Sequence, residues 1–171
     1  EVPPKTLWCD IFSGLFSLVY VAFLAGFTVL LVREPSGEWW VFTLILVVVS
    51  VDVGAYAAGI TLGKHKMTPR ISPNKTWEGF AGAAVAACVT ATLMTTLVLG
   101  QPWWLGIIMG VLLLLSATGG DLTESLIKRN LGVKDMSSWI PGHGGFLDRL
   151  DSILPSAAVV FGIALAAGVI A

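Results

Sequence analysis

The sequence predicts an all-α fold, a polytopic integral membrane helical bundle with about five transmembrane helices. Hydrophobic residues make up 56% of the 171-residue chain and charged residues only 12%, whereas soluble domains carry roughly 25% charged residues. The apolar residues form long blocks, each near the roughly 20 residues that a helix needs to cross the hydrocarbon layer. The blocks lack the alternating pattern of membrane barrel strands, so helices are the remaining way to pair every backbone group within lipid.

The positions of the apolar blocks and of the basic residues predict the topology. In chain order, the blocks cover about residues 11–32, 39–62, 79–100, 103–120 and 153–171. Nine of the ten basic residues lie before the first block or in the loops after the second and fourth, and only Arg33 lies on the other side. Cytoplasmic loops carry an excess of lysine and arginine. The sequence therefore predicts both long polar loops and the N-terminus in the cytoplasm, and the C-terminus outside.

The second block contains an aspartate near its middle. Asp52 shares one helical face with Tyr56, Gly59 and Gly63, because residues three or four positions apart lie on the same side of a helix. An ionisable side chain at this depth must face the protein interior or a wet cavity, which indicates a functional residue. Two alternatives stay open: a structural aspartate bonded to a neighbouring helix, and the coupling carboxylate of a transporter.

The loop before the third block, "KHKMTPRISPNKTWEG", is basic and contains helix-start signals. Three residues are candidate N-caps for a following helix: Ser72, which precedes a proline, Asn74 and Thr76. Helix N-termini bind anions, and Lys75 beside one would strengthen that binding. The alternative is an ordinary basic cytoplasmic loop, with Met67 and Trp77 as interface anchors.

Polar residues gather again after the fourth block. One helical stripe is expected to hold Asp121, Glu124, Ser125 and Lys128. Further on, the stretch "GHGGFLDRLDS" combines glycines, which let a ligand approach the main chain, with Asp148 and Asp151 three positions apart. Carboxylates without cysteine ligands suit a hard cation such as Mg²⁺, and nearby lysine and arginine suit phosphate oxygens. This chemistry indicates phosphoryl or nucleotidyl transfer.

The segment "SLIKRNLGVKDMSSWIPGHGGFLDRLDS" closely resembles the signature of phosphatidate cytidylyltransferases, also called CDP-diacylglycerol synthases. The matching residues are Ser125, Lys128, Arg129, Lys134, Asp135, His143, Gly144, Gly145, Asp148, Arg149 and Asp151. The family resemblance extends upstream to the helical face that contains Asp52, to Lys64 and to the stretch "SPNKTWEG". It therefore covers roughly residues 45–155. Members usually carry further helices upstream. We therefore expect residues 1–171 to form a single transmembrane catalytic domain that lacks upstream helices.

The resemblance implies a reaction of CTP with phosphatidate to give CDP-diacylglycerol and pyrophosphate, dependent on Mg²⁺, with K⁺ alongside as an open alternative. It implies metal binding by Asp121, Asp148 and Asp151, and these three with Lys128 are the predicted catalytic residues. The predicted substrate-binding residues are Asp52, Lys64, Ser72, Asn74, Lys75, Thr76, Glu78, Ser125, Arg129, Lys134, His143, Gly144, Gly145 and Arg149. The nominal depth of Asp52 separates it from Asp121 unless a cavity reaches down to it.

The expected setting is the inner (plasma) membrane, crossed several times, with the active site facing the cytoplasm and membrane lipids as partners. No nucleic-acid partner is expected, and a homodimer is left open. The alternatives are a CTP-dependent lipid kinase of the polyprenol or phytol type and, in a different class, a transporter that uses Asp52. A CDP-alcohol phosphotransferase is excluded because its D-G-x2-A-R motif does not occur in the sequence.

Overall fold

The computed structural model describes residues 4–68, 72–131 and 152–169, and their fold confirms the predicted all-α membrane bundle. The elements in chain order are α1 (Pro4–Arg33), α2 (Gly37–Leu62), β1 (Lys66–Thr68), β2 (Ser72–Thr76), α3 (Trp77–Leu97), α4 (Trp103–Leu131) and α6 (Ile153–Ala166). The small antiparallel hairpin of β1 and β2, in which Lys66 pairs with Thr76, is an addition that the apolar pattern did not predict.

Three helices within the described residues are long and apolar enough to cross a membrane, judged by length and composition. They are α2, α3 and the Trp103–Arg129 part of α4, whereas Tyr20–Arg33 and α6 are shorter apolar helices. The fourth apolar block ends near residue 120, and the helix was expected to continue through Lys128; α4 extends to Leu131, which confirms this. Its polar end keeps helical spacing, and Glu124 and Lys128 form an i,i+4 ion pair there, which supports the helix.

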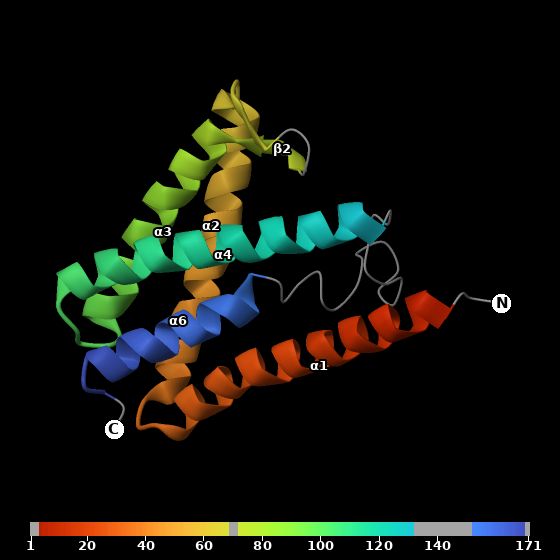
Figure 1. The fold of residues 1–171 in the computed structure, drawn as a ribbon. Helices are drawn as coiled ribbons and strands as arrows, with labels where there is room; N and C mark the ends of the chain where they lie inside the picture. The colour runs from red at the N-terminus through yellow and green to blue at the C-terminus, as the bar shows by residue number, and fades with distance from the viewer. Residues whose placement is uncertain (1–3, 69–71, 132–151, 170–171) are drawn as a thin grey trace, which may run out of the picture.

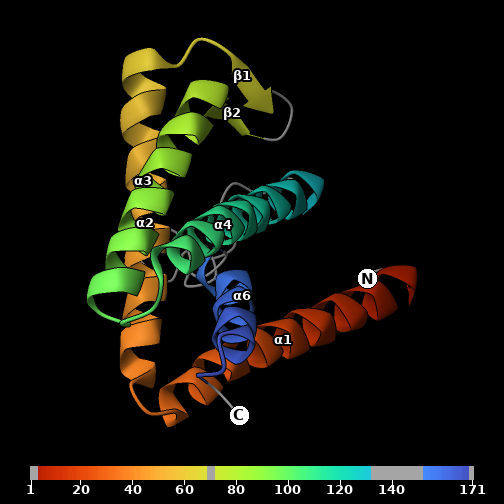
Figure 2. The same cartoon turned by 90° about the vertical axis from the view of Figure 1, so that its left-hand side faces the viewer.

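The helices form a crossed arrangement rather than a row of parallel rods. α2 and α3 form a pair joined by the hairpin at one end, and α4 crosses this pair, as both views show (Figure 1, Figure 2). α6 packs between α4 and α1. Because α4 crosses the pair at an incline, its C-terminal half leaves α3 and passes beneath the hairpin, where the site described below is formed.

Small residues allow the helices to approach closely, as is usual in membrane bundles. A Cβ atom added to Gly82 of α3 would lie 2.3 Å from the Cβ of Ala58 in α2. A Cβ atom added to Gly110 of α4 would lie 2.8 Å from the Cα of Cys88 in α3. The crossing of the three helices therefore depends on contacts that tolerate no larger side chain.

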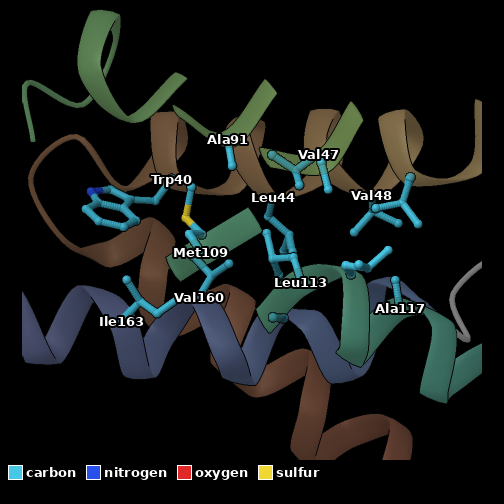
Figure 3. Close-up of a cluster of buried hydrophobic side chains, with 14 of the residues drawn as sticks. Trp40, Leu44, Val47, Val48, Ala91, Met109, Leu113, Ala117, Val160 and Ile163 are labelled. Atoms are coloured by element: carbon cyan, nitrogen blue, oxygen red, sulfur yellow. The ribbon is translucent and has the colours of Figure 1, made fainter. Parts of the chain in front are cut away.

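A single apolar cluster forms the core where these helices cross. Figure 3 shows Met109 and Leu113 of α4 between side chains of α2 and Val160 of α6. Three members of the cluster, Val51, Ala83 and Ala117, also line the cavity beneath the hairpin. The close-packed core thus ends directly at the floor of that cavity.

Candidate functional site

A cavity of about 310 Å³ lies where α2, β2, α3 and α4 meet. Its apolar floor is the edge of the core, and its remaining wall is rich in polar groups. The polar residues that line it are Asp52, Tyr56, Ser72, Asn74, Lys75, Thr76, Thr118 and Asp121. Ionisable groups that converge on a concave site with an apolar floor are the usual form of a small-molecule site.

A second hollow, of about 710 Å³, lies between α4 and α6 around Gln101 and Trp104. It is larger than the first, but no charged side chain lines it. Phosphate chemistry needs charge neutralisation. The smaller polar cavity is therefore the candidate functional site.

An ion pair closes one side of this cavity. The Nζ atom of Lys75 in β2 contacts the Oδ2 atom of Asp121 in α4, with side chains 22% and 42% exposed, respectively. Partial exposure screens the attraction, so the pair contributes at most about 1 kcal/mol to stability. Its importance is geometric, because it joins the hairpin to the polar half of α4.

Asp52 lines the same cavity as Asp121. Its depth along α2 suggested a wide separation from Asp121, but the cavity reaches down between the two helices. Residues of both helices line it, among them Asp52 of α2 and Thr118 and Asp121 of α4. The cavity therefore contains two carboxylates from different helices and one ammonium group from the hairpin.

Thr76 is the N-cap of α3. Its hydroxyl oxygen accepts a hydrogen bond from the backbone N–H of Gly79 at 3.1 Å, which satisfies one of the free donors of the first turn. The alternative caps Ser72 and Asn74 are wrong because α3 begins only at Trp77, so that both residues lie too early in β2 to cap it. Thr76 and Gly79 both line the cavity, so the start of α3 forms part of its wall.

Glu78 binds the turn that follows α2. Its carboxylate accepts hydrogen bonds from the backbone N–H groups of Lys64 and His65, at 3.2 Å and 3.2–3.3 Å. Its Oε1 also lies 2.6 Å from Nδ1 of His65. Neither Glu78 nor Lys64 is among the lining residues, and their predicted contact with substrate stays a prediction.

The polar end of α4 continues beyond Asp121. Glu124 is buried, and its Oε1 lies 3.0 Å from Nζ of Lys128. Ser125 is half-buried and Arg129 is exposed. None of these residues lines the cavity, so the predicted roles of Ser125, Lys128 and Arg129 stay predictions.

The remaining predicted site residues lie outside the described residues. They are Lys134, His143, Gly144, Gly145, Asp148, Arg149 and Asp151. The expected meeting of Asp121 with Asp148 and Asp151 around one cation therefore stays a prediction.

The described donors suit a hard cation. No group of three His, Cys, Asp or Glu side chains converges within residues 4–68, 72–131 and 152–169. Asp52 and Asp121 supply two carboxylates to the cavity, which is also lined by hydroxyl and amide side chains. Mg²⁺ prefers oxygen ligands and is commonly held by one or two carboxylates together with substrate phosphates and water. The cavity thus fits Mg²⁺ by donor chemistry.

The sequence did not identify several of the cavity residues as site residues, and Thr118 and Met67 are two of them. Thr118 precedes Asp121 by three positions and therefore shares its helical face, which is the signal that could have identified it. Met67 was expected to be an interface anchor, yet it lines the cavity. The hairpin was not predicted, so no sequence pattern indicated that Met67 turns inward.

Comparison with known proteins gives consistent matches along the chain. A sequence profile of the cytidylyltransferase family matches residues 4–166. The phosphatidate cytidylyltransferase of Mycobacterium bovis is 46% identical over 159 residues, which cover 92% of this chain and 52% of that protein. The Mycobacterium leprae protein of the same name is 46% identical over 152 residues, 89% of this chain and 49% of its own length. The Brucella suis protein of that name is 42% identical over 144 residues, which cover 81% of this chain and 53% of that protein. The chain spans about half the length of these curated relatives.

Proposed function

The chain belongs to the cytidylyltransferase family, and on this basis we propose that it forms part of a phosphatidate cytidylyltransferase of phospholipid biosynthesis. The reaction is CTP plus phosphatidate giving CDP-diacylglycerol plus pyrophosphate. The observation that carries the proposal is the family match over residues 4–166. The polar cavity supports it, because lysine and carboxylate side chains from three elements meet there.

In the proposed reaction, a phosphate oxygen of phosphatidate forms a bond to the α-phosphorus of CTP. The bond between that phosphorus and the oxygen bridging to the β-phosphorus breaks, and pyrophosphate leaves with the electron pair. The phosphatidate phosphate is anionic near neutral pH, so the reaction requires no general base. The protein's task is to align the two phosphates and to neutralise their charge.

Lys75 is the described residue best suited to hold a phosphate oxygen, because its ammonium group lies at the cavity wall. Lys128 and Arg129 lie about two turns beyond Asp121 on α4, and they are proposed to bind phosphates farther from the cavity. Asp52 is proposed to contact substrate from the opposite wall. Lys134, His143 and Arg149 complete the proposed phosphate-binding set from outside the described residues.

Mg²⁺ is the proposed cofactor, and when bound it would reduce the negative charge on the phosphates. Asp121 is the described residue proposed to hold it, together with Asp148 and Asp151 from outside the described residues. The oxygen-rich lining of the cavity supports this choice. K⁺ as a second cation is a further proposal, tested by varying the monovalent salt.

The proposed location is the inner membrane, with the cavity on the cytoplasmic side. Two observations support this orientation. The hairpin and the polar end of α4 lie together, and nine of the ten basic residues belong to segments predicted on one face. Phosphatidate would then enter from lipid and CTP from the cytosol.

Labelled CTP distinguishes this proposal from its rivals. With the protein in phosphatidate-containing vesicles and Mg²⁺, label in the α-phosphate should enter lipid, and label in the γ-phosphate should appear in pyrophosphate. A CTP-dependent lipid kinase would instead transfer the γ-label to lipid and release CDP. A transporter would move solute without nucleotide and incorporate neither label. Either of these two outcomes overturns the proposal.

A further inference from the structure

The turn between α2 and β1 is closed by hydrogen bonds around one carboxylate. Glu78 accepts from the backbone N–H groups of Lys64 and His65 and lies 2.6 Å from Nδ1 of the His65 ring. The backbone N–H of Trp77 donates in return to the carbonyl oxygen of His65 at 3.0 Å. The turn at the base of the hairpin therefore both donates hydrogen bonds to the first turn of α3 and accepts one from it.

The same turn is packed tightly against the end of the hairpin. A Cβ atom added to Gly63 would lie 3.0 Å from the side chain of Thr76 and 2.2 Å from the carbonyl oxygen of Gly59. The backbone of the turn thus touches the residue that ends β2 and caps α3. A shift of the turn would be transmitted directly to β2.

The hairpin depends on this base for its position. A two-stranded hairpin is marginally stable alone, and β2 makes few contacts with α2 and α3 beyond its pairing with β1. Yet β2 carries Ser72, Asn74 and Lys75, which line the cavity. Figure 2 shows the hairpin projecting from the end of the helix pair above α4. Its direction decides whether Lys75 reaches Asp121.

We propose that His65 and Glu78 are positioning residues that fix the hairpin over the cavity. They hold the α2–β1 turn against α3, and the turn holds β2 so that Lys75 lies against Asp121. A catalytic role for the placement of Lys75 against Asp121 rests on the function proposed above. The effect of His65 and Glu78 on the position of the hairpin does not. Glu78 acts through the turn, since it does not line the cavity. His65 thereby gains a role that its sequence context did not indicate.

Conservative variants of His65 separate positioning from general loss of fold. The amide nitrogen of asparagine occupies the same place along the side chain as Nδ1 of histidine, whereas glutamine carries its amide one carbon farther. His65→Asn should therefore retain the bond to Glu78, and His65→Gln and His65→Ala should lose it. Thr61→Ala is the matched control, because the Thr61 hydroxyl donates a hydrogen bond to the carbonyl oxygen of Ala57 in its own helix.

The first measurement is independent of activity. Spin labels on cysteines at positions 74 in β2 and 126 in α4, both exposed, report the distance from the hairpin to α4 by pulsed electron resonance, with the native cysteines replaced by alanine. The parent protein, His65→Asn and Thr61→Ala should each give one narrow distance distribution. His65→Ala and His65→Gln should each give a broad one. An unchanged distribution in His65→Ala overturns the positioning role of the His65 side chain whatever the activity.

The second measurement is cytidylyl transfer to phosphatidate by proteins without labels. The His65 side chain is exposed, so loss of its bond to Glu78 should lower kcat/KM by up to about fivefold in His65→Ala and His65→Gln. His65→Asn should recover to within about twofold, and Thr61→Ala should match the parent protein. Equal rates in the asparagine and glutamine variants would overturn the positioning role. A parent protein that transfers no cytidylyl group, yet shows the expected distance changes, would overturn the proposed function alone.

Discussion

Lys75 of β2 and Asp121 of α4 contact each other across the cavity, although all of α3 separates them in the chain. The contact joins a basic loop to a polar helix end that the sequence presents as two separate clusters. Asp52 of α2 lines the same cavity. Three segments of the chain therefore share one site, and the following predictions test that arrangement.

Removal of the Lys75 charge should strengthen metal binding and weaken catalysis. The ammonium group lies on the carboxylate that is proposed to hold Mg²⁺, so the two cations compete for Asp121. An exposed ion pair contributes up to about 1 kcal/mol, so Lys75→Met should raise the affinity of the substrate-free protein for Mn²⁺ by up to about fivefold. Electron resonance of free Mn²⁺ measures this affinity. Lys75→Arg keeps the charge and serves as control. Equal affinity in Lys75→Met and the parent protein would contradict the competition.

Loss of the Asp52 charge should reduce turnover without unfolding the protein. Asp52→Asn keeps the size of the side chain but removes a charge from the cavity wall, and we expect kcat/KM for CTP to fall about tenfold or more, which equals about 1.4 kcal/mol of transition-state stabilisation. Glu38→Gln makes the same change in the first turn of the same helix, far from the cavity, and should leave the rate unchanged. Parent-like activity in Asp52→Asn would remove Asp52 from the site.

Glycine at the α2–α3 contact should be needed for stability. Gly82→Ala would bring a methyl group 2.3 Å from the Cβ of Ala58 and 2.8 Å from the carbonyl oxygen of Gly54, and overpacking of this kind costs about 1–3 kcal/mol. Gly26→Ala in α1 meets nothing within 4 Å and should be neutral or stabilise its helix by up to about 1 kcal/mol. Thermal unfolding in detergent measures both. Equal melting temperatures for the two variants would show that the crossing is looser than described.

The pair of Glu124 and Lys128 should be coupled in stability. Glu124 is buried and lies 3.0 Å from the lysine, so Lys128→Met leaves a buried carboxylate without this partner and should destabilise the protein by about 3 kcal/mol. The double variant Glu124→Gln with Lys128→Met should recover most of the loss. A double-mutant cycle of unfolding free energies measures the coupling. Additive losses would show that the two side chains act independently.

The sequence by itself determined the class of fold and the positions of the helices, and it singled out six of the residues that line the cavity: Asp52, Ser72, Asn74, Lys75, Thr76 and Asp121. Lipid leaves no freedom in how a backbone pairs its polar groups, so long apolar blocks had to be helices. Intramembrane charges are costly, so Asp52 had to face a polar space. For the cap of α3 the sequence offered Ser72, Asn74 and Thr76, and the structure selects Thr76.

Only the tertiary structure decided how these residues meet. The hairpin, the cavity that unites Asp52 with Asp121 and the inward turn of Met67 belong to the packing of α2, β2, α3 and α4 against one another. That packing depends on close approach at Gly82, between α2 and α3, and at Gly110, between α3 and α4. Small residues are common along membrane helices, and helical periodicity describes one helix at a time. The choice of partner, and with it the shape of the site, therefore depends on contacts between segments far apart in the chain.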